Sequence, residues 1–294
     1  MRNRPQWGLV IALIASMALG LNSTFAKFAY RAGLDPNTLT ALRLNVAALV
    51  LWLLFLLRWR ALIPISRPAL LGCMMMGAAN FTAQISYYWG LTRISASVGT
   101  LIFYLYPAVV ILLLRLRGEA LTTRRLARLG IAFVGVALLV DITGRQVDLI
   151  GVLLILVTIL TYALHLVIGQ FVVRDVPART VALYVISTMA VLAAALRLLV
   201  GGSPLPVTWA GWWPVLGLGL LGTVVARLAM FTAIKRVGST QLALLGVVEP
   251  VITVAVTRVF LGETLAPIPG LGGGLVLASL LLVDLPPRPA AAQA

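Results

Sequence analysis

Long apolar segments, separated by short polar turns, recur along almost the whole chain. A helix that crosses the hydrocarbon core of a membrane needs roughly 20 mostly apolar residues at a rise of about 1.5 Å each. Single prolines mark several boundaries between segments, as at Asp35-Pro36 and Val176-Pro177. The pattern predicts ten spanning helices, at about 7–28, 36–57, 68–91, 96–115, 125–142, 149–173, 178–200, 209–234, 240–260 and 266–283.

Composition supports an all-α integral membrane protein. Of 294 residues, 61% are apolar and 11% charged, and the mean hydropathy is +1.06, whereas about a quarter of the residues in a soluble domain are charged. The net charge of +15 does not indicate nucleic acid binding, because the basic residues lie singly or in short clusters between apolar segments. The single cysteine, Cys73, excludes a disulfide within the chain and a cysteine metal cluster. We expect no cofactor and no metal.

Lys and Arg are distributed unequally between the two sides of the predicted membrane. The side that holds the N-terminus carries fifteen of the 23 basic residues and the other side six, while Arg43 and Arg227 fall inside segments. Because cytoplasmic loops carry an excess of Lys and Arg, both termini are expected in the cytoplasm. The first apolar segment is long enough to span and shows no convincing cleavage site, so we interpret it as a retained helix.

One stretch of the chain occurs twice in the same register. The matching pairs are Arg93 and Arg236, Ser97 and Thr240, and Pro107 and Pro250, each 143 residues apart, with Glu119 and Glu263 separated by 144. The two copies lie five predicted helices apart, and an odd offset means that equivalent helices cross the membrane in opposite directions. We therefore expect two five-helix halves, 1–145 and 146–294, in inverted topology, with a short disordered C-terminal tail. Such repeats are typical of secondary transporters.

The second copy also resembles a known family. Its stretch from Arg236 through Glu249-Pro250, followed by Phe260-Leu-Gly-Glu-Thr-Leu265 and Gly270-Leu-Gly-Gly-Gly274, is similar to the EamA family of the drug/metabolite transporter superfamily. The resemblance implies a ten-helix, 5+5 inverted-repeat carrier of the bacterial inner membrane that exports amino acids or related metabolites. Among the members, the sequence looks most like exporters of aromatic amino acids. The first copy has Tyr106 where the second has Glu249, so no acid is expected there.

Polar residues recur along the third predicted helix. Asn80, Gln84, Tyr87 and Tyr88 follow each other at helical spacing and share a face. A polar face in a membrane must meet protein or water, because unpaired polar groups in lipid cost several kcal/mol. The 143-residue offset maps Gln84 onto Arg227, so we expect both near a central substrate cavity. The alternative is that these residues only join helices, at about 0.6 kcal/mol each.

Arg227 is the sharpest candidate for a substrate-binding residue. A charge at bilayer depth costs at least ~2.5–3.5 kcal/mol and usually faces a cavity or a partner. Its guanidinium suits the carboxylate of an amino acid, and the alternative is an ion pair with Glu249, the acid well inside a predicted span. Arg43 is a weaker candidate, which either lines the site, snorkels outward or pairs structurally.

Prolines inside two equivalent helices indicate candidate hinges. Pro107 and Pro250 each remove a helical hydrogen bond, so a kink is expected near both. Beside Pro250, Glu249 is a candidate gating residue, and a structural hydrogen bond is its alternative. The remaining cavity candidates are aromatic side chains and the sole histidine, which stack on a substrate ring or simply pack: Tyr104, Tyr162 and His165.

The leading hypothesis is a secondary transporter that exports amino acids, aromatic and other neutral ones, by alternating access. Its partners are then the small-molecule substrate and the lipid bilayer, with no nucleic acid and no obligatory protein partner. A drug exporter of the same superfamily and a weakly selective channel remain alternatives. An enzyme is not expected, because intramembrane chemistry needs clustered ligands or a base and nucleophile pair, which isolated acids, one histidine and one cysteine do not supply.

Overall fold

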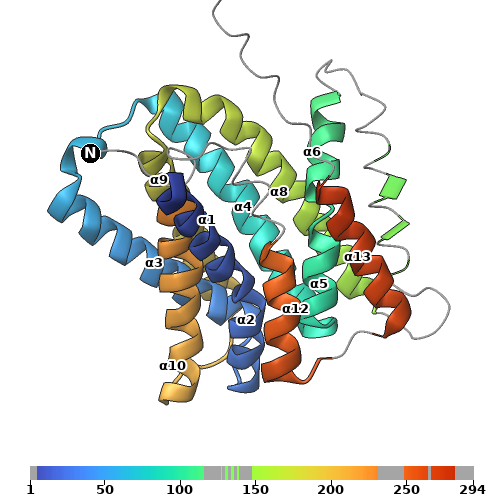
Figure 1. The fold of residues 1–294 in the computed structure, drawn as a ribbon. Helices are drawn as coiled ribbons and strands as arrows, with labels where there is room; N and C mark the ends of the chain where they lie inside the picture. The colour runs from blue at the N-terminus through green and yellow to red at the C-terminus, as the bar shows by residue number, and fades with distance from the viewer. Residues whose placement is uncertain are drawn as a thin grey trace, which may run out of the picture.

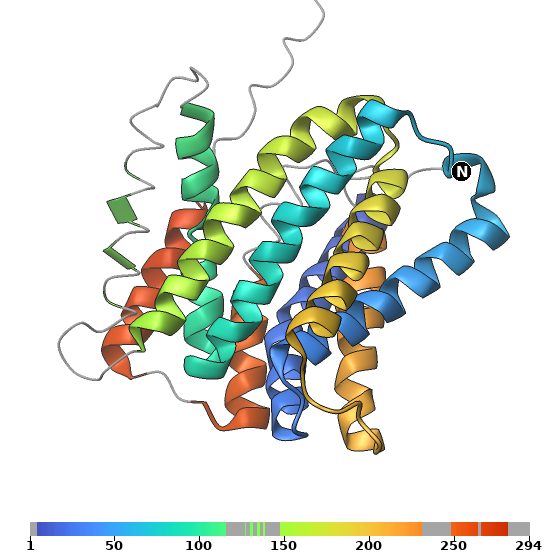
Figure 2. The ribbon, with the colours of Figure 1, turned by 180° about the vertical axis from the view of Figure 1, so that it is seen from behind.

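The computed structural model is a bundle of helices whose axes run between two opposite ends (Figures 1 and 2). The structure describes residues 5–115, 148–230, 248–263 and 266–281, together with residues 127, 130, 131, 134, 135 and 138. The elements within these ranges are α1 (Pro5–Gly20), α2 (Asn22–Arg31), α3 (Pro36–Arg58), η1 (Arg60–Leu62), α4 (Arg67–Arg93), α5 (Ala96–Phe103), α6 (Tyr106–Arg115), α8 (Leu149–Asp175), α9 (Ala178–Val200), α10 (Trp209–Leu216), the π-helical η2 (Gly217–Val225), α12 (Val248–Leu261) and α13 (Pro267–Leu281).

Some of the ten expected segments correspond to single described helices, whereas those at 7–28 and 96–115 are each divided between two. Four of them, at 36–57, 68–91, 149–173 and 178–200, coincide with α3, α4, α8 and α9 to within two residues. The segment at 125–142 and the C-terminal tail lie mostly or wholly outside the described residues. By length and composition, five described helices can cross a membrane: Val10–Arg31, Pro36–Arg58, Leu149–Gly169, Ala178–Val200 and Trp209–Met230.

Helix starts follow from local capping chemistry. Asp35 precedes Pro36, and its Oδ1 accepts a hydrogen bond of 2.8 Å from the Thr38 backbone N–H. Asp148 caps α8 in the same way, through a 3.0 Å bond from the Gly151 N–H. That bond, followed by the hydrogen bond from Arg93, lowers the pKa of the Asp148 carboxyl below its usual value. These caps satisfy orphan backbone N–H groups at the helix ends.

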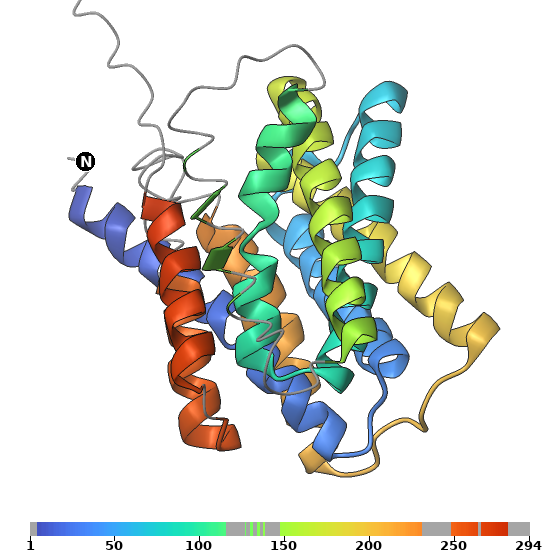
Figure 3. The same cartoon turned by 90° about the vertical axis from the view of Figure 1, so that its right-hand side faces the viewer.

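The helix that contains Pro107 is broken as expected. α5 ends at Phe103, α6 begins at Tyr106, and Leu105 N–H turns back to the Ile102 carbonyl instead of continuing the α-helical ladder (Figure 3). A proline cannot donate to the carbonyl four residues earlier, which here belongs to Phe103. The equivalent bend at Pro250 lies at the edge of the described residues, because α12 starts at Val248.

Equivalent helices of the two expected halves run in opposite directions. α4 leads from the end of the bundle where α1 begins to the end where α2 stops, and the Trp209–Met230 helix runs the other way (Figures 1 and 2). The same opposition holds for α3 and α9. These directions agree with the odd helix offset between the two sequence copies.

The centre of the bundle depends on close helix approach at small residues. α4 packs along α8 and against α9 (Figure 2), and a Cβ added to Gly77 of α4 would lie 2.6 Å from the Thr188 Cβ and 3.0 Å from the Val185 carbonyl of α9. Small residues let helix backbones approach where lipid provides no hydrophobic drive for association. Gly77 is therefore required by packing.

We predict that Gly77→Ala lowers the stability of the protein in detergent by about 1–3 kcal/mol, because an overpacked interface must move apart. Thermal unfolding checks this. The matched control is Gly274→Ala in α13, where an added Cβ meets nothing within 4 Å. There the better helix propensity of alanine leaves stability unchanged or raises it by up to about 1 kcal/mol. Equal unfolding temperatures for wild type and Gly77→Ala would contradict the packing argument.

Candidate functional site

The guanidinium of Arg43 is held at the centre of the bundle by three neighbours. Its side chain on α3 is 2% exposed. Nη1 donates a 3.2 Å hydrogen bond to Thr223 Oγ1 of η2, and Nη2 donates to Gln84 Oε1 of α4. The guanidinium also lies over the Tyr88 ring, 4.9 Å from its centroid. We call these four residues the arginine cluster.

The arginine cluster contains a buried positive charge without a negative partner. Within the described ranges, no carboxylate lies within salt-bridge distance of Arg43, and the ion pair found there joins Arg93 to Asp148 at 2.9 Å. Neutral hydrogen bonds and one aromatic face compensate only part of the desolvation of a buried cation. This arrangement favours an anionic group, supplied from outside the protein, beside Arg43.

Several polar atoms around the arginine cluster have no protein partner. Arg43 Nε is buried and unpaired, and so are both amide atoms of Asn80, a residue that is 1% exposed. Asn80 lies one turn before Gln84 on α4, so it belongs to the face that meets Arg43. On α2, Asn22 Oδ1 is also unpaired and lies against the backbone of Gly222, next to Thr223. Unpaired donors and acceptors therefore occur together at this depth.

A second group, the aromatic cluster, surrounds the break between α5 and α6. Its centre is Phe103, whose ring centroid lies 5.2 Å from those of Tyr106 and Tyr162 and 5.8 Å from that of Tyr87. Tyr162 stacks on His165 at 5.7 Å. The members of the aromatic cluster are Tyr87, Phe103, Tyr104, Tyr106, Tyr162 and His165.

Arg227 and Glu249 lie beside the aromatic cluster rather than in the arginine cluster. Tyr162 is hydrogen-bonded to Arg227, and Glu249 is hydrogen-bonded to Tyr104. The charges of Arg227 and Glu249 also attract each other. Each charge is thus anchored by a different tyrosine, and Arg227 is near enough to act electrostatically on Arg43 and His165.

The two remaining candidates each have a firm local partner. His165 Nδ1 lies 3.0 Å from the Met76 carbonyl of α4, the contact of a packed and satisfied ring. Tyr87 OH hydrogen-bonds to Ser23 at 2.7 Å and to Thr100 at 2.9 Å, and those two hydroxyls bond to each other at 3.0 Å. Tyr87 therefore joins α2, α4 and α5.

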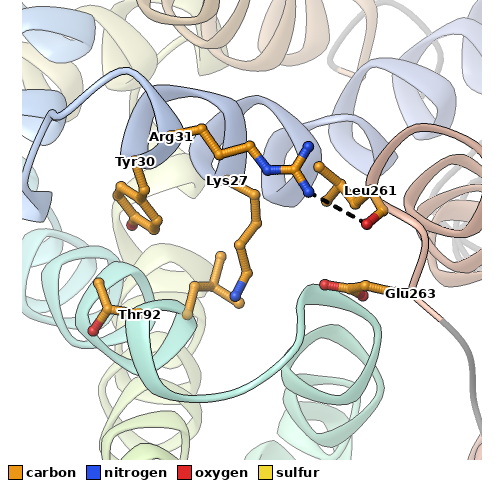
Figure 4. A pocket seen from close by; sticks show the side chains of 7 residues that line it. Lys27, Tyr30, Arg31, Thr92, Leu261 and Glu263 are labelled. Atoms are coloured by element: carbon orange, nitrogen blue, oxygen red, sulfur yellow. Dashed lines mark hydrogen bonds between the residues drawn. The ribbon is translucent and has the colours of Figure 1, made fainter.

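A pocket of about 490 Å³ opens at the end of the bundle where α2 stops, away from both clusters (Figure 4). Lys27, Arg31 and Glu263 give it charged walls, and Figure 4 shows Lys27 and Glu263 extending toward the same space. Arg31 donates a 3.3 Å hydrogen bond to the Leu261 carbonyl, and Lys27 donates one of 2.7 Å to the Ile94 carbonyl. Tyr30, Leu91 and Thr92 complete the lining.

The structure regroups the residues selected from the sequence. Gln84 and Tyr88 meet at Arg43, which the sequence ranked below Arg227, while Tyr104 and Tyr162 meet around Phe103. Pro107 lies at the break, and Pro250 follows Glu249 at the start of α12. Sequence analysis missed Phe103, Tyr106 as an aromatic partner, and Ser23. The dense aromatic run from Phe103 to Tyr106, directly before a proline, was the available signal for the first two.

Comparisons with known proteins agree with this architecture. The profile described as the EamA-like transporter family matches residues 6–141 and again 149–284. A Bacillus subtilis protein called uncharacterized transporter YcbK is 25% identical over 287 residues, covering 91% of this chain and 89% of that protein. An Archaeoglobus fulgidus protein called uncharacterized transporter is also 25% identical, covering 94% and 96%. A solved crystal structure with 22% identity shares the fold, with a TM-score of 0.66 over 93% of this chain and 96% of that one.

We predict that Asn80→Leu raises the stability of the ligand-free protein by about 1–3 kcal/mol, because it replaces a buried polar group without partners by an apolar one of similar size. Thermal unfolding in detergent checks this. The comparison variant is Asn45→Leu on α3: Asn45 is exposed, but its Nδ2 is hydrogen-bonded, donating to the Ala41 carbonyl at 2.8 Å and to the Ala190 carbonyl at 3.3 Å. Asn45→Leu should destabilise. Loss of stability in both variants would show that Asn80 is satisfied within the protein.

Proposed function

Because the chain belongs to the EamA-like transporter family, and is therefore a multi-pass membrane protein that transports small molecules, we propose that it exports amino acids by alternating access. The proposal places it in the bacterial inner membrane with both termini in the cytoplasm. The opposite directions of α4 and the Trp209–Met230 helix support two inverted five-helix halves. In such carriers the substrate site lies near the midplane between the halves.

One observation supports the substrate class most directly: Arg43 is a buried guanidinium with an unpaired Nε and no carboxylate within salt-bridge distance in the described ranges. A substrate carboxylate beside it would form charge-assisted hydrogen bonds, which are about twice as strong as neutral ones. The unpaired carbonyl oxygens of Asn80 and Asn22 are acceptors for an ammonium group. A zwitterion offers both a carboxylate and an ammonium group. A plain anion would leave the Asn80 and Asn22 oxygens unpaired, and a plain cation would leave Arg43 Nε unpaired.

The aromatic cluster supports substrates with an apolar or aromatic side chain. Aromatic rings prefer offset or edge-to-face contacts at centroid distances of 4.5–7 Å, and Phe103, Tyr106 and Tyr162 already meet one another at 5.2 Å. A substrate ring would extend this arrangement. Tyr87, which contacts both Tyr88 of the arginine cluster and Phe103, connects the two clusters.

One observation favours a cationic drug as a second candidate. Glu249 lies among tyrosines, and a carboxylate surrounded by aromatic faces is suited to an organic cation. Arg227 opposes this assignment because its positive charge acts on the same carboxylate. The amino-acid proposal rests instead on Arg43 and on the unpaired oxygens of Asn80 and Asn22, and a cationic substrate is the alternative outcome of the transport test.

The transport test uses proteoliposomes and labelled phenylalanine, threonine and glutamate, with and without internal unlabelled substrate and with an imposed pH gradient. We expect saturable uptake that internal substrate accelerates, strongest for phenylalanine. Arg227→Ala should abolish it if Arg227 binds the substrate, and leave it intact if Arg227 only balances Glu249. Linear, weakly selective flux would indicate a channel, and flux of organic cations alone would transfer the assignment to a drug exporter.

We predict that Arg43→Lys lowers the kcat/KM of amino-acid uptake by about tenfold or more, because lysine replaces a planar, forked donor by a point charge. The matched control is Arg179→Lys, since Arg179 also stacks on an aromatic ring, 4.6 Å from the centroid of Trp59, outside the arginine cluster. Uptake by Arg179→Lys should equal that of wild type. Undiminished uptake by Arg43→Lys would contradict recognition of the carboxylate by this guanidinium.

A further inference from the structure

We propose that the interface where α2, α5 and α12 meet, here called the seam, is the exit path of this transporter. The seam is closed in the structure, and Glu263, which follows α12, holds it closed by binding the first turn of α5. This inference rests on the proposed transport function and adds the route by which the substrate leaves the site. It also assigns a role to Glu263, which the sequence identified only as part of a repeated motif.

Buried hydroxyls follow the seam from mid-depth toward the end of the bundle. On α12, Thr253 and Thr257 stand four and eight residues after Glu249, and both are at most 1% exposed. This spacing places all three along one side of the helix. Thr257 Oγ1 lies 2.8 Å from Ser97 Oγ of α5, and Thr253 Oγ1 donates a 2.8 Å bond to the Gly20 carbonyl at the end of α1.

The facing helices continue the same polar line. Ser97 and Thr100 lie one turn apart on α5, and Thr100 bonds to Ser23 of α2 at 3.0 Å. Lys27 stands one turn after Ser23, on the wall of the pocket at the end of the bundle. Polar side chains thus recur along this seam between the level of Glu249 and the pocket.

Glu263 holds the seam shut at its outer end. Its Oε1 accepts the Ala96 N–H at 2.9 Å, and its Oε2 accepts the Ser97 N–H at 3.0 Å and the Ser97 Oγ hydrogen bond at 2.8 Å. The carboxylate belongs to the turn after α12, so these three bonds join α12 to the N-terminus of α5. Lys27 of α2 attracts the same carboxylate. Glu263 therefore fastens α12 to α5, and the charge of Lys27 on α2 favours the same closed arrangement.

This arrangement suits a gate better than a permanent contact. A static interface in a membrane bundle needs only apolar and small residues, whereas a path for a zwitterion must present polar groups once the helices part. When closed, the hydroxyls bond to one another and to backbone carbonyls, so no polar group is left facing lipid. When open, the same groups line a wetted route from Glu249 to the pocket.

The closed state is tested by thiol accessibility. In a background with Cys73→Ala, the variant Thr253→Cys places one thiol deep in the seam. Right-side-out and inside-out vesicles are then treated with a charged, membrane-impermeant methanethiosulfonate reagent. We expect slow modification with Glu263 intact and about a tenfold faster rate in Glu263→Ala, the size expected when a helix cap is lost. Modification should occur from the face opposite the N-terminus.

The matched control is Asp148→Ala, which removes a different carboxylate cap at the same end of the bundle. Asp148 caps α8 and pairs with Arg93, outside the seam, so its loss should leave the labelling rate unchanged. Equal labelling with Glu263 intact and removed, in protein that elutes as a folded species, would overturn the latch. Faster labelling from the N-terminal face would overturn the assignment of the seam as the exit.

A disulfide tests whether the seam must open during transport. In the Cys73→Ala background, Ser97→Cys with Thr257→Cys replaces two hydroxyls whose oxygens are 2.8 Å apart. Oxidation should stop counterflow and a reductant should restore it; full flux with the disulfide formed would contradict the proposal. The thiol-labelling result needs no substrate. If Glu263→Ala speeds thiol labelling as expected but no amino acid is transported, the gate proposal is supported and the proposed substrate class is wrong.

Discussion

The burial of the Arg43 guanidinium in a membrane protein is the constraint on which the rest of the central site depends. A charge at bilayer depth costs at least ~2.5–3.5 kcal/mol, and this one is supported by Gln84, Thr223 and the face of Tyr88. Those supports come from α4 and η2, while Arg43 itself belongs to α3, so these three elements must stay in register for the charge to be tolerated. Close backbone contact at Gly219 and Gly222 of η2 makes that register possible, because an added Cβ would meet the Arg43 carbonyl at 3.0 Å or Asn22 Oδ1 at 1.8 Å.

The aromatic cluster depends on a different constraint, the loss of a helical hydrogen bond before Pro107. Phe103 and Tyr106, three residues apart across the break between α5 and α6, both contact the Tyr162 ring, while Tyr104 between them lies near Glu249. Phe103 ends α5 and Tyr106 begins α6, so the break sets how these rings approach one another. The proline therefore shapes the site as well as supplying a place where the helix bends.

Much of the architecture could be predicted from the sequence, because membrane helices need length and apolarity and α3, α8 and α9 have both. The site was less predictable. Arg227 and Arg43 look alike in sequence, each a basic residue inside an apolar segment, and depth alone does not say which one lacks a carboxylate nearby. Phe103 is indistinguishable in sequence from a lipid-facing residue until the break before Pro107 turns its ring inward. For His165 the sequence offered either substrate contact or packing; the structure adds the 3.0 Å contact of its Nδ1 with the Met76 carbonyl, and substrate contact stays a prediction.

Residues of the two copies of the repeated motif contact each other, which the 143-residue spacing alone did not predict. Glu263 belongs to the second sequence copy, yet its carboxylate caps α5, which belongs to the first. Ser97, another motif residue, donates two of these hydrogen bonds, from its N–H and from its hydroxyl, and also meets Thr257 of the second copy. The motif is therefore an interface between the two halves rather than a feature of each half alone. Glu263 accepts hydrogen bonds from backbone N–H groups, whose positions hardly depend on the side chains of α5. The contact can therefore persist after duplication and inversion while the neighbouring side chains change. A carrier that works by moving one half against the other needs a strong but reversible contact at this boundary, and three hydrogen bonds to the buried first turn of α5 provide it.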